Sequence, residues 1–173
     1  MMSPILSVCI ITQGRAAWLR RAMASVAPVA DEIVCVDGGS TDDTETVIRS
    51  FPNARYVRRD WPGDFADQKN FAIDQARGDW VFILDHDEMV GERFRRGVRK
   101  WIASPRYTHY KFARYWLWAT DPLRYVRSEK LHPDFQTRLF RNLPVFRYRP
   151  KPSAGGAEWG SVHHAFPRAD RGP

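Results

Sequence analysis

Cysteine is scarce in this sequence, with only 2 among 173 residues, and each stands inside an apolar run. Two cysteines this far apart provide fewer ligands than a zinc site needs. We therefore interpret Cys9 and Cys35 as buried free thiols of a reducing compartment.

Long hydrophobic runs are also lacking. No stretch reaches the roughly 18 apolar residues that a membrane-spanning helix requires, so we expect no such helix. The N-terminus has no basic segment ahead of its apolar run, so we expect no signal peptide either.

Charge is abundant but unevenly placed. The net charge is +7, yet acidic side chains slightly outnumber basic ones up to Leu84, so the positive charge is concentrated in the C-terminal half. A basic half suits phosphate-bearing ligands, anionic lipid surfaces or nucleic acid. A solvated basic face is an equally good interpretation, and charge alone does not choose among these.

The first hundred residues alternate between two hydrophobic patterns. Strand-length runs rich in β-branched residues occupy 5–12, 31–37, 54–59 and 80–85. The stretches between them repeat apolar residues with helical spacing. This alternation predicts an α/β fold, a Rossmann-like, mostly parallel sheet flanked by helices. After residue 104 the chain becomes aromatic and strand-like, which predicts a small antiparallel C-terminal part, and 167–173 is expected to be a frayed tail.

Local signals predict where some elements end. Ser40 or Thr41 is expected to cap the second helix, and Gly78 to close the third. The run at 54–59 is weaker than the others and is expected at the periphery of the sheet. The segment VFRYRP, 145–150, has a strand-like pattern.

Polar residues end three of the predicted strands, namely Thr12, Asp37 and Asp85. Parallel sheets bind ligands beyond the carboxyl ends of their strands, so we expect these residues at one edge. Gly38 and Gly39 let the backbone approach a ligand closely, although a tight turn before a helix explains them as well.

The segment DHDE gathers three carboxylates directly after the fourth predicted strand. Asp85 and Asp87 repel each other unless a positive charge lies nearby, and a hard divalent cation, Mg²⁺ or Mn²⁺, would supply it. The alternative is that these acids only serve the start of the helix that begins near Glu92.

Two further pairs of residues are candidates for the same edge. Lys69 and Asn70 fall at the start of the third helix, although a surface lysine is an equal alternative. His163 and His164 are adjacent in a predicted strand, so at most one of them faces a given site. Imidazole acts as a base or as a metal ligand near neutral pH.

Together these motifs resemble those of family-2 glycosyltransferases, inverting enzymes with the GT-A fold. The resemblance covers roughly residues 5–165 and is densest in SVCIITQGRAAWLRRAMASV, ADEIVCVDGGSTDDT, DQKNFAIDQARGDWVFILDHDE and DFQTRLFRN…VHHAF. The subgroup that it resembles is that of the small bacterial lipopolysaccharide-core glucosyltransferases. The resemblance implies a nucleotide-diphosphate-sugar donor, most often UDP-linked, a glycan or lipid-linked acceptor, and Mg²⁺ or Mn²⁺.

The resemblance also implies a division of the chain and a location. One glycosyltransferase domain is expected over 1–173, with the nucleotide sugar bound by 1–104 and the acceptor by 105–166. We expect a cytoplasmic protein. Because the acceptors of this subgroup are often lipid-linked, peripheral contact with the inner face of the membrane is an open alternative.

The site residues are carried over from the family by position. The donor-binding positions correspond to Thr12, Asp37, Lys69, Asn70, Asp85 and Arg138. The metal-binding positions correspond to Asp85, Asp87 and His163, and Asp87 matches the more direct ligand.

This sequence departs from the family pattern at two places that concern chemistry. Gly14 replaces an asparagine, which removes one side-chain contact. His164 replaces a glutamate that is a plausible general base, and imidazole can take that role at neutral pH. The candidate bases are therefore His164, Glu158 and Asp134.

The expected reaction is a single in-line displacement that inverts the anomeric carbon. The acceptor is expected over the segment YKFARYWLWA, where Tyr115, Trp116 and Trp118 would stack on a sugar, although core packing explains these aromatics equally well.

The main alternative is a catalytically inactive sugar-nucleotide-binding protein. Nucleic acid is not an expected partner, because its phosphates give no reason for the Asp85–Asp87 pair. Nucleotidyl transfer is a poor match, because the N-terminal loop lacks the expected glycines and lysine.

Overall fold

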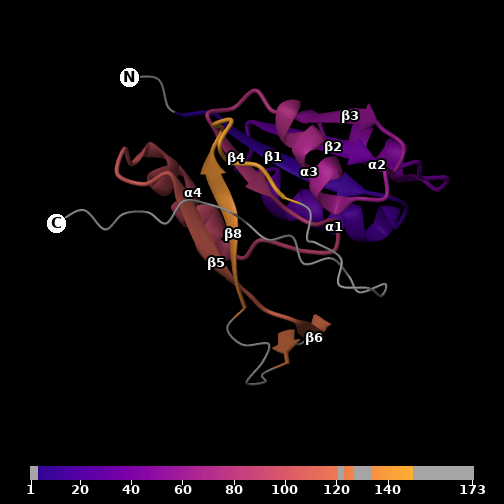
Figure 1. Cartoon of the computed structure of the whole chain (residues 1–173). Helices are drawn as coiled ribbons and strands as arrows, with labels where there is room; N and C mark the ends of the chain where they lie inside the picture. Colours follow the sequence, from indigo (N-terminus) through magenta and orange to yellow (C-terminus); the bar gives the residue numbers. More distant parts are fainter. Residues whose placement is uncertain (1–3, 121–122, 127–133, 150–173) are drawn as a thin grey trace, which may run out of the picture.

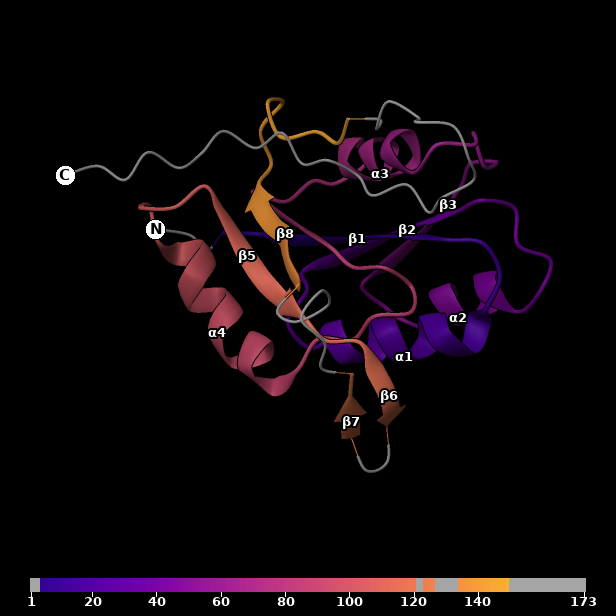
Figure 2. The same cartoon turned by 60° about the horizontal axis from the view of Figure 1, so that its bottom comes forward.

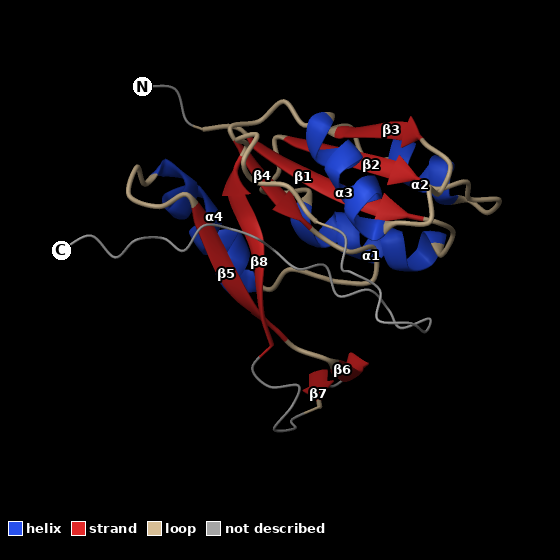
Figure 3. Ribbon diagram, viewed as in Figure 1, coloured by secondary structure: helices blue, strands red, loops and turns tan. Residues whose placement is uncertain are grey.

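A computed structural model describes residues 4–120, 123–126 and 134–149 (Figure 1, Figure 3). The elements in chain order are β1 (Leu6–Thr12), α1 (Ala16–Val26), β2 (Glu32–Asp37), α2 (Thr44–Arg49), β3 (Ala54–Arg58), α3 (Phe65–Asp74), β4 (Trp80–Ile83), α4 (Glu92–Ala103), β5 (His109–Arg114), β6 (Leu117–Thr120), β7 (Leu123–Tyr125) and β8 (Asp134–Arg141). The predicted alternation of strands and helices over the first hundred residues is confirmed.

Six strands form one sheet in the order β3-β2-β1-β4-β8-β5. The first four are parallel, whereas β8 runs antiparallel to both β4 and β5. The predicted mostly parallel sheet with an antiparallel C-terminal part is therefore confirmed, and β3 lies at its edge as expected. A separate hairpin of β6 and β7 follows β5 and stands apart from the main sheet (Figure 1).

Helices cover both faces of the sheet. Figure 2 shows α3 on one face and α1, α2 and α4 on the other. The side chains of β1 alternate between these two layers, so that Leu6 and Val8 pack with α1 and α4 whereas Cys9 packs with α3. This arrangement explains why β1 is apolar along its whole length, since a parallel strand covered on both faces has no solvent side.

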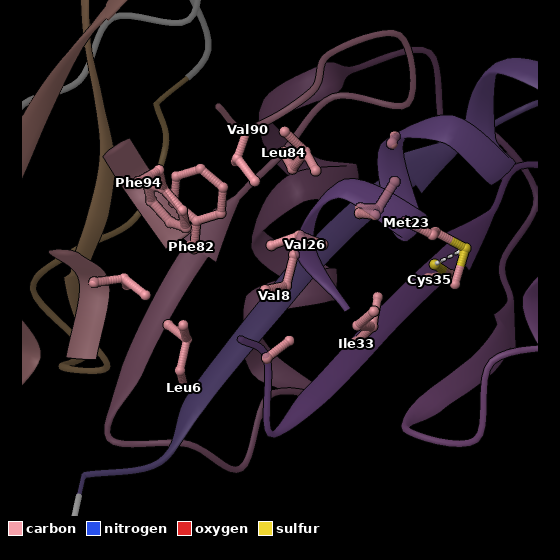
Figure 4. Packing of buried hydrophobic residues seen from close by; sticks show 14 of the residues in the cluster. Leu6, Val8, Met23, Val26, Ile33, Cys35, Phe82, Leu84, Val90 and Phe94 are labelled. Carbon is pink, nitrogen blue, oxygen red and sulfur yellow. Dashed lines mark hydrogen bonds between the residues drawn. The ribbon is translucent and has the colours of Figure 1, made fainter. Parts of the chain in front are cut away.

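Both cysteines are buried free thiols, as predicted. Burial raises the pKa of each, so the thiol form persists well above neutral pH. Cys35 Sγ lies 3.9 Å from Met23 Sδ inside the cluster shared by β2 and α1 (Figure 4). These cysteines therefore belong to the core.

Three of the predicted local signals were wrong. Neither Ser40 nor Thr41 caps the second helix, because α2 begins only at Thr44 and Asp43 precedes it. The third helix ends at Asp74, four residues before Gly78. The segment 145–149 forms a turn and irregular chain instead of a strand.

Gly78 has a packing role instead of a capping one. A Cβ at this position would lie 2.6 Å from Ser7 Oγ and 2.7 Å from the Ile5 carbonyl oxygen. The Gly78 N–H donates to the same Ser7 hydroxyl at 2.8 Å. Only a residue without a side chain lets the start of β4 approach β1 this closely.

Within the described residues, no helix is both long and apolar enough to cross a bilayer.

Gly78→Ala is expected to lower the free energy of unfolding by about 1–3 kcal/mol, the usual cost of forcing an atom into a packed site. Gly91→Ala is the matched control, because a Cβ at Gly91 meets nothing within 4 Å. The measurement is urea unfolding followed by circular dichroism. Equal stabilities of the two variants would contradict the assigned close approach.

Candidate functional site

The carboxyl ends of the parallel strands bring the predicted polar residues to one edge. Thr12 and Asp37 are register partners across β1 and β2. Ile83 of β4 pairs with Cys9 of β1, so Asp85, two residues further on, leaves the sheet at the same end. The structure thus assembles the three residues that the sequence placed after strands.

Asp37 is fully buried and holds the turn after β2. Its Oδ1 accepts hydrogen bonds from the N–H groups of Gly39 (3.2 Å) and Ser40 (2.9 Å), and its Oδ2 accepts one from the Tyr56 hydroxyl (3.0 Å). The Ser40 hydroxyl in turn accepts the N–H of Gly14 at 2.6 Å. Asp37 therefore shapes the two loops at this edge, and its contact with a nucleoside stays a prediction.

The Asp85 carboxylate is neutralised by two cations of the protein. Lys69 Nζ lies 2.7 Å from its Oδ1 and Arg138 Nη2 lies 3.0 Å from its Oδ2. Burial by itself would raise the pKa of Asp85, but the charges of Lys69 and Arg138 outweigh it and hold this pKa well below its ordinary value. The expectation that this acidic segment needs a divalent cation to be tolerated was therefore wrong for Asp85.

Glu88 closes the turn that follows β4. Its N–H donates to the Asp85 carbonyl at 3.0 Å, and its Oε2 accepts the Asp85 N–H at 3.2 Å. Its Oε1 accepts a hydrogen bond from Arg138 Nη2 at 2.7 Å. Burial raises the pKa of Glu88, an effect that Arg138 opposes and the neighbouring Asp85 charge reinforces. Glu88 thus fixes both the backbone of the turn and the buried arginine.

Asp87 differs from its neighbours because it is exposed. Within the described residues its carboxylate takes part in no ion pair, and no three His, Cys, Asp or Glu side chains converge on a common point. Mg²⁺ is commonly held by one or two carboxylates together with substrate phosphate oxygens and water. Asp87 is thus an exposed carboxylate at this edge, and its role as a metal ligand stays a prediction.

Asn70 is occupied by the backbone of the segment after β8. Its amide donates to the Tyr148 carbonyl at 2.9 Å and accepts the Tyr148 N–H at 2.8 Å. Lys69 lies over the ring of the same tyrosine, 5.6 Å from its centroid. These contacts account for Asn70 as an anchor for the chain near Lys69, and its predicted role beside the donor stays untested.

Asp134 is a poor candidate for a general base. Arg114 donates to its Oδ2 at 2.6 Å and 2.9 Å, and Gln136 donates to its Oδ1 at 2.6 Å. Burial would raise its pKa, but these hydrogen bonds and the arginine charge lower it below the ordinary value. A carboxylate with a lowered pKa binds protons weakly. The other two candidate bases, Glu158 and His164, lie outside the described residues, as does the predicted metal ligand His163.

Sequence reasoning missed two members of this ion-pair network, Glu88 and Arg114. Glu88 was visible as the last letter of DHDE, directly after the pair that received a role. Arg114 Nη1 lies 3.4 Å from Glu88 Oε1, and the sequence indicated only that Arg114 belongs to an aromatic, strand-like region. Neither partner could be assigned without the order of the strands.

A parallel sheet with an antiparallel strand inserted beside β4, and with a polar edge that carries DHDE, defines the GT-A class of folds. The profile of glycosyl transferase family 2 matches residues 7–153, and the chain belongs to this family. The resemblance seen in the sequence is thereby confirmed.

Two curated relatives show the range of similarity. A TPR repeat-containing protein of Synechococcus elongatus is 31% identical over 83% of this chain and 33% of its own length. The lipopolysaccharide core biosynthesis glycosyltransferase LpsC of Rhizobium meliloti is 28% identical over 94% of this chain and 63% of its own length. The chain therefore spans less than two thirds of either relative.

Solved structures share the fold. TarS of S. aureus gives a TM-score of 0.59 over 80% of this chain and 47% of its own, at 17% identity. TarS bound to UDP-GlcNAc gives 0.51 over 57% and 31%, at 22% identity. A mannosyltransferase of Pyrobaculum calidifontis, in complex with GDP-Man and Mn²⁺, gives 0.52 over 63% and 35%, at 24% identity.

Asp85→Asn is expected to lower the free energy of unfolding by about 3 kcal/mol, because it leaves Lys69 and Arg138 as mutually repelling, buried cations. Asp87→Asn is the matched control and should change stability by less than about 0.5 kcal/mol, because Asp87 is exposed. Urea unfolding at neutral pH measures both. Similar losses in the two variants would contradict the assigned ion pairs.

The difference in unfolding free energy between the wild type and Asp85→Asn should depend on pH in a defined direction. The pKa of Asp85 is lower in the folded chain than its ordinary 3.8. Its stabilising contribution is therefore complete above pH 3.8 and is lost as the pH falls through the folded-state pKa. Urea midpoints measured between pH 7 and pH 2.5 should show the gap between wild type and Asp85→Asn narrowing in acid. A gap that widens would refute the sign of this shift.

Proposed function

We propose that this chain transfers a sugar from a nucleotide-diphosphate sugar, UDP-linked, to a hydroxyl of a glycan or lipid-linked acceptor. The observation that carries the proposal is the contrast between neighbouring carboxylates. Asp85 is locked by Lys69 and Arg138, whereas Asp87 is exposed at the same edge. The carboxylate of Asp85 is held by buried cations, and the exposed carboxylate of Asp87 follows two residues later. This arrangement suits the binding of a divalent cation together with a diphosphate.

The solved relatives support this choice of donor and cofactor. TarS has been solved with UDP-GlcNAc, and the Pyrobaculum mannosyltransferase with GDP-Man and Mn²⁺. LpsC carries a name that places it in lipopolysaccharide core biosynthesis. By this analogy we assign a nucleotide-sugar donor, Mg²⁺ or Mn²⁺, and an envelope glycan as acceptor to the present chain.

The residues at the edge would then have distinct roles. Asp87 would hold the divalent cation, which would supply positive charge to the leaving diphosphate. Asp85, paired with Lys69 and Arg138, would hold in place the turn that presents Asp87. Thr12 and the loop shaped by Asp37 lie on the nucleoside side of the same edge.

The acceptor hydroxyl needs a base on the opposite side of the anomeric carbon if the configuration is to invert. The hydrogen bonds to Asp134 make it ill-suited, so His164 and Glu158 remain as the proposed bases.

The alternative function is a sugar-nucleotide-binding protein without activity. It is favoured by the replacement of a glutamate by His164 and by the engaged carboxylate of Asp134.

The basic half of the chain supplies little reason to propose nucleic acid as a partner. Several of its arginines pair with acids of the protein, including Arg99 with Asp31 and Arg147 with Asp74. Among the described residues, the outer face of α4 carries exposed basic side chains, such as Arg93 and Lys100. We keep peripheral membrane contact through this helix as part of the proposal, since a lipid-linked acceptor would bring the chain to a membrane surface.

Asp87→Ala should abolish the rise in melting temperature that UDP with Mn²⁺ causes in the wild type, and with it nucleotide release from a UDP-sugar. The physical reason is the loss of the exposed carboxylate that holds the cation. Asp74→Asn, at the end of α3 that points away from this edge, should retain both. The measurements are thermal shift and a coupled assay of UDP release.

The outcomes separate the two candidate functions. A UDP shift without nucleotide release, for every donor and acceptor offered, would favour the inactive binding protein. A shift that persists in Asp87→Ala would reject the assigned role of Asp87.

A further inference from the structure

Arg114 ends β5 and joins three parts of the molecule. Its guanidinium donates to Asp134 at the start of β8 through Nε and Nη2, and its Nη1 lies 3.4 Å from Glu88 Oε1. The same guanidinium lies over the indole of Trp116, with 4.7 Å between Cζ and the ring centroid. One planar cation therefore connects the turn after β4 with the residues that lead into the β6–β7 hairpin.

Large apolar side chains are exposed where the hairpin begins. Trp116 is 46% exposed, Tyr115 50% and Tyr125 48%, and the last two rings meet edge to face with centroids 5.2 Å apart. Core packing, which was an equal explanation of Tyr115 and Trp116, therefore does not account for them. A contiguous exposed aromatic surface beside a polar site is a mark of ligand binding.

We propose that Trp116 is the platform on which a sugar ring of the acceptor stacks, and that Arg114 is the positioning residue that holds its indole there. The proposal rests on the proposed function, because it assigns the acceptor side of the same edge. β5 pairs with β8 through Arg114 and Asp134, and Glu88 belongs to the turn that presents Asp87. The guanidinium of Arg114 thus contacts both the Trp116 indole and Glu88 of the turn that is assigned to the donor.

The charges around Trp116 favour an uncharged ring over an anionic headgroup. Arg114 is already matched by the carboxylates of Asp134 and Glu88, so its guanidinium offers no unpaired positive charge beside the indole. A lipid phosphate placed on this ring would meet two carboxylates and no uncompensated cation among these contacts. A pyranose ring offers apolar C–H faces for the indole and hydroxyls for the neighbouring carboxylates.

Saturation-transfer NMR tests the platform, with a panel of methyl pyranosides and short oligosaccharides as probes and with UDP and Mn²⁺ present. The wild type and Trp116→Phe should transfer saturation to ring protons of at least one probe. Trp116→Ala should weaken binding of that probe about tenfold, the size of an aromatic stacking contribution. Trp18→Ala is the matched control, because Trp18 is also about half exposed (47%) and lies under an arginine, Arg21.

A test of the positioning role of Arg114 needs a measured quantity that would not change if Arg114 only stabilised the fold. Arg114→Lys keeps the charge but loses the planar fork that pairs with a carboxylate and covers a ring. We expect the dissociation constant of the probe sugar to rise several-fold while the thermal shift caused by UDP with Mn²⁺ stays at the wild-type value. A matched loss of sugar and UDP binding would show a structural role and overturn the assignment.

Three further results would also overturn the proposal: no probe binds the wild type, Trp116→Ala binds the sugar as well as the wild type, or the wild type sediments with anionic phospholipid vesicles and Trp116→Ala does not. The last would make the surface a membrane contact. Failure of the donor assignment is read separately, from the absence of any UDP shift in the wild type, because sugar binding to Trp116 is scored from its own signals.

Discussion

The pairing of Asp85 with Lys69 and Arg138 is the constraint on which the edge of this sheet depends. Lys69 comes from α3 and Arg138 from β8, so one carboxylate ties together a helix, an antiparallel strand and the end of β4. Because both cations are nearly buried, neither can lose its partner without a large penalty. The network fixes the turn after β4 before any ligand arrives, and it leaves Asp87 as the exposed acid.

This arrangement changes the electrostatic interpretation of the DHDE segment. From the sequence alone, the acidic cluster predicts a self-repulsion that a bound cation would offset. In the folded chain the repulsion at Asp85 and Glu88 is offset by arginines and a lysine that arrive from elsewhere. Under the proposed function, a divalent cation would be a partner of the donor diphosphate and of Asp87, and the balance of charge at Asp85 would not require it. Asp85 therefore contributes to stability, whereas Asp87, two positions later, is the residue proposed for ligand binding.

The fold was largely predictable because its signals are local. Strand and helix periodicities located the first four strands, and strand ends placed Thr12, Asp37 and Asp85 at one edge. The ion pairs were not predictable, because Arg138 stands 53 residues from Asp85 and meets it only after β8 inserts beside β4. Gly78 was misread for a related reason. A glycine is required at this position because the chain at β1, distant in sequence, lies close to it. A helix cap, the role expected of Gly78, depends on local sequence only.

We propose that the protein itself balances Asp85 and that a metal binds only together with a diphosphate. Calorimetric titration of the wild type with Mn²⁺, first alone and then with saturating UDP, distinguishes these two events. We expect little or no heat of binding with Mn²⁺ alone and clear binding once UDP is present. Tight uptake of Mn²⁺ without nucleotide would refute the proposal, because the acidic turn would then hold a cation on its own.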